Sequence, residues 1–135
     1  MAVHLEFVVL GPPVSNQTPG PNLTTWRATI TGAATLNWAN PPLTGELKAI
    51  IINFYTGNKP SLDVDNLSKP ILDVMQKIVY DDDRQIVQAE FTHAKIGAAY
   101  SIVGVRPLLV TVLQAGNPFV YVRIEDPVNP FPLPT

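Results

Sequence analysis

A stretch between residues 62 and 86 concentrates carboxylates around one helical pattern. Six of the chain's eleven acidic residues lie in it: Asp63, Asp65, Asp73, Asp81, Asp82 and Asp83. Two carboxylates about 4 Å apart repel by about 4 kcal/mol at an effective dielectric constant of about 20, so a cluster of them needs protons or cations to offset the repulsion. Hard oxygen ligands of this kind suit Mg²⁺ and Mn²⁺. The stretch therefore predicts a divalent-metal site, provided that its two ends converge.

A helix is expected between the two acidic ends. Apolar residues recur there at steps of three and four: Leu67, Ile71, Leu72, Met75 and Ile78. This spacing is typical of an amphipathic helix. Because proline is tolerated in the first turn of a helix but not deep inside it, Pro70 predicts a helix over residues 68–78 with Ser68 as its cap.

The flanking carboxylates are expected to meet beside this helix. Asp63 and Asp65 would precede it in a loop or an irregular first turn, where a spacing of two lets both side chains face the same way. The chain would then have to turn back after the helix, and the strand expected from Gln85 would return Asp82 or Asp83 toward Asp65. Asp81 is taken as solvated.

Other interpretations of the carboxylates stay open. A run of aspartates after a helix is often a solvated turn, and acidic residues before a helix also favour its dipole. The segment from Asp63 begins like a calcium loop, but Ser68 and Val74 stand where that loop needs glycine and glutamate. No zinc spacing, glycine-rich phosphate loop or nucleophile elbow is present. A carboxylate cluster with Lys69 nearby fits phosphodiester hydrolysis, in which the lysine would balance charge on the scissile phosphate.

The remaining elements predict an α+β fold with a small mixed β-sheet and two helices packed against it. Residues 3–11, 45–57, 85–97 and 106–115 are expected as strands, and 117–127 as a further strand or an edge extension. Residues 24–40 are expected as the other helix. Residues 1–127 then form a single domain, and 128–135 form a proline-rich C-terminal tail without regular structure.

Composition narrows the class of protein. The chain has 135 residues and no cysteine, which excludes disulfides and thiolate metal sites. No signal peptide or membrane span is expected, so we interpret the protein as cytoplasmic. The net charge is −2, but residues 61–90 hold seven acids and three bases, and the rest of the chain holds four acids and six bases. The acidity is therefore local. The sequence has no strongly basic stripe, and this counts against tight DNA binding by a monomer.

The acidic stretch also carries a resemblance to a known family. "DVDNLSKPILDVMQKIVYDDDRQI" (residues 63–86) resembles the motif of the RusA family of Holliday junction resolvases: Asp-x-Asp-Asn-Leu-x-Lys, a helix with an internal Asp, an aromatic residue, then Asp-Asp-x-Gln and a strand. "LGPPVSNQ" looks like the loop after the family's first strand. "HAKIG" and "RPLLVTVL" look like its closing strands.

The resemblance implies a RusA-like homodimer that cuts four-way junctions or other branched DNA, with Mg²⁺ as cofactor and Mn²⁺ as a possible substitute. It implies a role in DNA recombination and repair, in a bacterium or a bacteriophage. It places the catalytic residues and their neighbours as follows: Asp63, Asp65, Asp83 and Lys69 as catalytic residues, the three aspartates with Asp82 as metal ligands, and Asn66 and Gln85 in support.

Two alternatives are weighed against this interpretation. The loop over residues 13–22 has no basic residue, and only Lys59 lies near Asp63 on its N-terminal side. Because cations are scarce, the first alternative is a protein of the same fold that binds branched DNA without cutting it. A non-enzymatic interaction protein, whose acidic loop only keeps a dimer soluble, is the second alternative.

Overall fold

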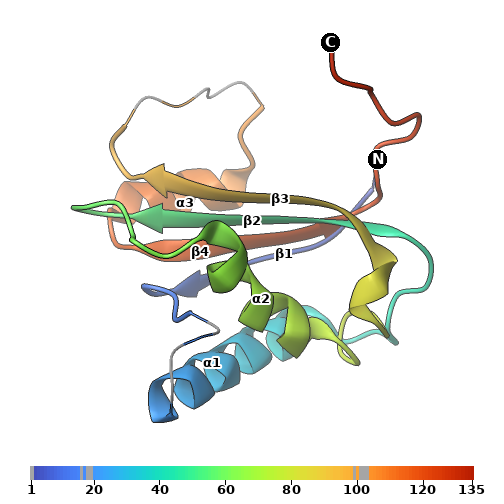
Figure 1. Cartoon of the computed structure of the whole chain (residues 1–135), viewed down its shortest axis with the longest axis horizontal. Coiled ribbons are helices and arrows are strands. Elements are labelled where there is room, and N and C mark those ends of the chain that lie inside the picture. The colour runs from blue at the N-terminus through green and yellow to red at the C-terminus, as the bar shows by residue number, and fades with distance from the viewer. Residues whose placement is uncertain (1, 16, 18–19, 99, 101–103) are drawn as a thin grey trace.

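A mixed sheet of four strands forms the centre of the computed structural model, which describes the chain except for residues 1, 16, 18–19, 99 and 101–103. The strands are β1 (Val3–Leu10), β2 (Leu47–Tyr55), β3 (Ile86–Lys95) and β4 (Phe119–Glu125), in the order β1-β4-β2-β3. β4 is antiparallel to both of its neighbours, whereas β2 and β3 are parallel (Figure 1). The α+β class and the mixed sheet predicted from the sequence are confirmed.

Two helices cover one face of this sheet (Figure 1). α1 (Pro21–Asn37) and α2 (Val64–Met75) pack against alternate residues of the strands. The contact buries Ile30 and Ala34 of α1 and Ile71 and Met75 of α2, all with no exposed surface. Burial of such side chains stabilises the domain by roughly 1.5–3 kcal/mol each for the larger ones. β2 contributes Ala49 and Ile51 to this face and Ile50 and Phe54 to the other, so it is buried on both faces.

The prediction of a strand over residues 106–115 is wrong, because this segment is a helix, α3 (Pro107–Ala115). Pro107 occupies its first turn, and Gly116 ends it in the left-handed conformation with φ 76°. These are the preferred start and stop residues of a helix. Its partly buried leucines and valine pack on the face of the sheet opposite α1 and α2: Leu108, Leu109, Val112 and Leu113. Packing on the sheet and the two end signals outweigh the strand preference of the β-branched residues.

The predicted bounds of the second helix are also wrong. α2 begins at Val64 with Asp63 as the N-cap residue, so Ser68 lies inside the helix and is buried. Pro70 sits in the helix interior, where it lacks the N–H that would bond to the fourth residue before it. The helix ends at Met75 because Gln76 is extended and Lys77 takes φ 69°. Packing of the apolar face of α2 therefore outweighs the cost of an internal proline.

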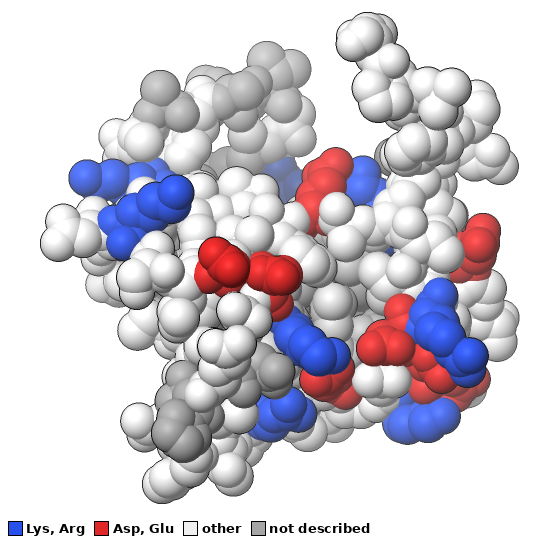
Figure 2. Space-filling view, in the orientation of Figure 1, with Lys and Arg blue, Asp and Glu red and all other residues white. Residues whose placement is uncertain are grey.

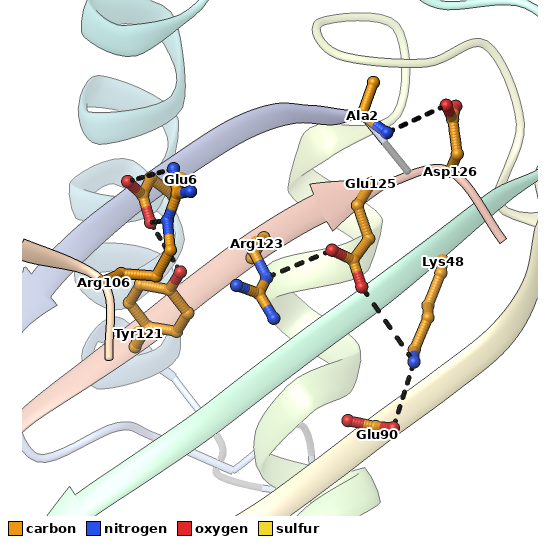
Figure 3. Close-up of polar contacts among 9 residues, drawn as sticks. All are labelled: Ala2, Glu6, Lys48, Glu90, Arg106, Tyr121, Arg123, Glu125 and Asp126. Atoms are coloured by element: carbon orange, nitrogen blue, oxygen red, sulfur yellow. Dashed lines mark hydrogen bonds and ion pairs between the residues drawn. The ribbon is translucent and has the colours of Figure 1, made fainter. Parts of the chain in front are cut away.

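An ion pair fixes α3 to the sheet (Figure 3). Arg106, the N-cap residue of α3, donates from Nε and Nη2 to the carboxylate of Glu6 on β1, at 3.2 and 3.0 Å. The hydroxyl of Tyr121 on β4 donates to the same carboxylate at 2.6 Å. The bond to Arg106, aided by Tyr121, holds the pKa of Glu6 below its ordinary value of 4.5.

We expect Glu6→Gln to lower the free energy of unfolding at pH 7 by about 1–2 kcal/mol, because charge-assisted hydrogen bonds are lost. A depressed carboxylate pKa stabilises the fold above the unfolded pKa, and this stability is lost as pH falls through the folded pKa. The difference between the two proteins should therefore shrink as pH falls below about 4.5. Urea unfolding from pH 7 to pH 3 measures it, with the exposed Glu46→Gln as control. A pH-independent difference would contradict the expectation.

Candidate active site

Two exposed carboxylates lie at the N-terminal end of α2. Asp63 is the N-cap residue, and its main-chain oxygen accepts a hydrogen bond from the Leu67 N–H at 3.2 Å. Asp65 lies in the first turn, where its Oδ1 accepts from the Asn66 N–H at 3.0 Å. The partial positive charge of a helix N-terminus stabilises such carboxylates. The exposed oxygens of this pair are free to take a hard cation.

Lys69 follows Asp65 by one helical turn. Its Nζ lies 3.2 Å from Oδ1 of Asp73, whose Oδ2 lies 3.6 Å from Nη2 of Arg27 on α1. Asp73 is therefore a partly buried bridge between two cations. The Lys69 side chain is 55% exposed, so it can leave this pair to meet a phosphate. No local pattern pointed to Arg27, because it lies far from Asp73 along the chain.

The second acidic segment follows the C-terminal end of α2. Asp82 caps a short 3₁₀ helix, η1 (Asp83–Gln85), by accepting from the Arg84 N–H at 2.9 Å. The guanidinium of Arg84 also donates to both oxygens of Asp82 at 3.3 Å. The main-chain bond and this ion pair hold the pKa of Asp82 below its ordinary value. Both oxygens of Asp82 thus already have partners, and Asp83 is the freer carboxylate.

Gln85 holds the second acidic segment in place with four hydrogen bonds. Its Oε1 accepts from the main-chain N–H groups of Asp81 and Asp82 at 2.9 and 3.0 Å. Its Nε2 donates to the carbonyl oxygens of Leu43 and Gly45 at 2.9 and 3.0 Å. One amide side chain therefore ties the segment to the loop that precedes β2. The bonds give a physical basis for the support role expected of this residue.

Tyr80 anchors the same segment to α2. Its side chain has no exposed surface, and its hydroxyl donates to the Leu72 carbonyl at 2.6 Å. Burial raises the pKa of Tyr80 well above its ordinary value, and the negative charges of Asp83 and Asp73 raise it further. The tyrosine therefore stays protonated and keeps its hydrogen bond. Gln76, which the sequence did not single out, adds a contact by accepting from the Asp83 N–H at 3.3 Å.

A single chain does not bring the two acidic segments into one site. Asp63 and Asp65 stand at one end of α2 and Asp83 beyond the other, and a helix of twelve residues is about 18 Å long. Among the residues that the structure describes, no three histidine or acidic side chains lie close enough together to hold a metal ion. On the side of the molecule that Figure 2 shows, the acidic side chains lie in separate groups. The convergence expected from the sequence is absent within one chain.

The arrangement defines a class of protein, a small α+β domain with exposed carboxylates and a lysine on one crossover helix. The family model for endodeoxyribonuclease RusA matches residues 16–125, which include both acidic segments. The chain belongs to this family of endodeoxyribonucleases, as the sequence resemblance predicted. No curated protein matches the chain. In the described part of the chain, no helix is both long and apolar enough to cross a membrane.

We expect Gln85→Ala to lower the free energy of unfolding by about 2 kcal/mol, because several main-chain groups lose their partner. Urea unfolding followed by circular dichroism measures the change. Gln114→Ala, on the exposed side of α3, serves as the control and should change stability by less than about 0.5 kcal/mol. Equal stability of the two variants would show that the acidic segment does not depend on the Gln85 amide.

Proposed function

We propose that the protein is a Mg²⁺-dependent, structure-selective endodeoxyribonuclease that cuts four-way junctions or other branched DNA by phosphodiester hydrolysis. Mn²⁺ is proposed as a substitute ion. The proposed setting is DNA recombination and repair in the cytoplasm of a bacterium or of a bacteriophage host. The family match across both acidic segments carries the proposal. The placement of Asp63 and Asp65 at the N-terminal end of α2, with Lys69 one helical turn after Asp65, supports it.

The residues at the N-terminal end of α2 fit the proposed chemistry. Asp63 and Asp65 are exposed oxygen donors of the type that Mg²⁺ prefers, and we assign them as ligands. A bound divalent cation would supply an activated water and stabilise the leaving oxygen. Lys69 offsets the charge of the scissile phosphate after it leaves Asp73. Asn66 supports the pair through the bond from its N–H to Asp65.

The same end of the domain offers cations for the DNA backbone. Lys95 is paired with Tyr55 at the C-terminal ends of β3 and β2, and Lys59 lies in the loop that leads from β2 to Asp63. Both lysines are exposed. With Lys69, they would bind phosphates on either side of the reacting one, and the binding would weaken with salt. This supports approach of the DNA at the N-terminal end of α2.

We propose that the third carboxylate, Asp83, comes from the second chain of a homodimer. The bonds of Gln85 and Tyr80 oppose a large movement of the segment within one chain. A two-fold interface is reciprocal, so each chain would give its Asp83 to the Asp63 and Asp65 of its partner. Asp82 then supports Asp83 through its cap on η1. Two symmetric sites of this kind suit a substrate with two-fold symmetry.

We expect the protein to nick a labelled four-way junction in Mg²⁺ but to leave linear duplex of the same sequence uncut. EDTA should abolish the nicks, and Asp65→Asn or Lys69→Met should slow them by about 100-fold or more. Asp81→Asn, an exposed residue with no assigned role, is the matched control and should cut at the wild-type rate. Junction binding without nicks in any divalent ion would favour the alternative of a non-cleaving branch-binding protein. Neither binding nor cutting would favour an interaction protein.

The source of the third carboxylate is tested by mixing chains. Asp65→Asn and Asp83→Asn proteins are each expected to be inactive alone. When they are unfolded and refolded together, a mixed dimer has one intact site if Asp83 acts on the partner's Asp65, and nicking should return. If both residues act within one chain, every site of the mixed dimer is defective. Continued inactivity of dimers that have demonstrably exchanged would therefore overturn the assignment to the partner.

A further inference from the structure

Two polar side chains from neighbouring strands reach the loop that leads into Asp63. Asn53 of β2 and His93 of β3 are directly opposite each other in the parallel register. Nδ2 of Asn53 lies 3.1 Å from Nδ1 of His93, and Nε2 of His93 lies 3.0 Å from the carbonyl oxygen of Leu62. Leu62 directly precedes Asp63, the N-cap residue of α2. The three groups form a continuous chain from the sheet to the acidic loop.

The direction of these hydrogen bonds follows from the acceptor at their end. A carbonyl oxygen can only accept, so Nε2 of His93 carries a proton and donates to Leu62. In the neutral ring, Nδ1 is then an acceptor, and the amide nitrogen of Asn53 donates to it. Asn53 is only 5% exposed. The Leu62 carbonyl thereby sets the tautomer of the imidazole, and the buried amide helps to set its orientation.

The surroundings of the pair are mostly apolar, with Ser68 and Thr92 as the other polar residues beside it. Ile51, Leu67, Ile71 and Val120 line the same small cavity as Asn53 and His93. A polar pair in such surroundings costs free energy unless its hydrogen bonds are made. The buried amide of Asn53 bonds to His93, and His93 in turn bonds to the Leu62 carbonyl at a more exposed position. The pair therefore couples the packing of the sheet to the conformation of the acidic loop.

Fixing the Leu62 carbonyl restricts the main-chain conformation of Asp63. The peptide group between the two residues is planar, so the position of the carbonyl also sets the direction of the Asp63 N–H. On its other side, the Asp63 carbonyl accepts from the Leu67 N–H at 3.2 Å. The main chain of Asp63 is thus held from both sides. The torsions of its side chain are left as the main freedom of its carboxylate.

We propose that His93, oriented by Asn53, is a positioning residue for Asp63. His93 does not touch the reacting atoms, and it acts by holding the peptide group that precedes the carboxylate. The inference rests on the proposed function in one respect, because Asp63 is assigned there as a metal ligand. Partners that orient metal ligands are typically worth about 10–100-fold in metal affinity or activity.

The test compares three changes at His93 with one control on the same strand. His93→Leu removes the donor, His93→Asn keeps a polar group that contacts Asn53 but cannot reach Leu62, and His93→Gln places an amide N–H near the position of Nε2. Gln88→Leu is the matched control, because the Gln88 side chain likewise takes part in two hydrogen bonds, both with the main chain of Val128. Hydrogen–deuterium exchange of residues 61–67 is measured without metal or DNA. Calorimetric titration with Mg²⁺ is measured separately.

We expect faster exchange of residues 61–67 and about 10-fold weaker Mg²⁺ binding in His93→Leu and His93→Asn. His93→Gln should restore most of the protection from exchange and most of the Mg²⁺ affinity. Gln88→Leu should change neither quantity. Unchanged exchange in His93→Leu and His93→Asn would overturn the inference, as would an equal effect of Gln88→Leu. Should His93→Leu not fold, His93→Asn against His93→Gln decides the question. Wild-type protein that neither binds Mg²⁺ nor cuts DNA would overturn the proposed function, while the exchange data would still decide the role of His93.

Discussion

The parallel pairing of β2 and β3 is the constraint on which the rest of the molecule depends. Two parallel strands cannot be joined by a tight turn, so the chain must cross the sheet before the second strand begins. α2 makes this crossing and buries Leu67, Ile71 and Met75 against the sheet. The residues before the helix are consequently at the C-terminal ends of the strands, and those after it are at the N-terminal ends. The separation of the two acidic segments is a direct result.

Uncharged side chains hold both acidic segments in place. Gln85 bonds main-chain groups around the second segment, and His93 bonds the carbonyl before the first. Amide and imidazole groups can bind main-chain groups without neutralising a carboxylate, so Asp63, Asp65 and Asp83 remain available for cations. Asp82 is the exception, since Arg84 occupies both of its oxygens. Hydrogen bonds from uncharged groups thus position the acidic segments, and the negative charge of the three carboxylates stays available to bind cations.

On the face of the sheet that α3 covers, the charged side chains are paired with one another. Lys48 lies 3.1 Å from Glu90 and 4.0 Å from Glu125, and Arg123 lies 3.4 Å from Glu125 (Figure 3). Cations that are paired in this way and largely covered offer little charge to a DNA backbone. Lys59, which is exposed in the loop before Asp63, is better placed for phosphates. The distribution of available cations therefore agrees with approach of DNA at the N-terminal end of α2.

The sequence by itself determined which residues are candidates for the chemistry, because the carboxylates, the lysine and the apolar spacing of α2 are local features that survive in any arrangement of the strands. It also determined the α+β class and the places of all four strands of the sheet, although it predicted a fifth strand over residues 106–115. Local signals failed where two of them competed, as for Pro70 inside α2 and for the β-branched residues of α3. Only the tertiary structure decided that Asp83 lies far from Asp65 within one chain and that Asn53 and His93 meet at Leu62. Strand direction and register join residues that are distant along the chain, and no local pattern encodes them.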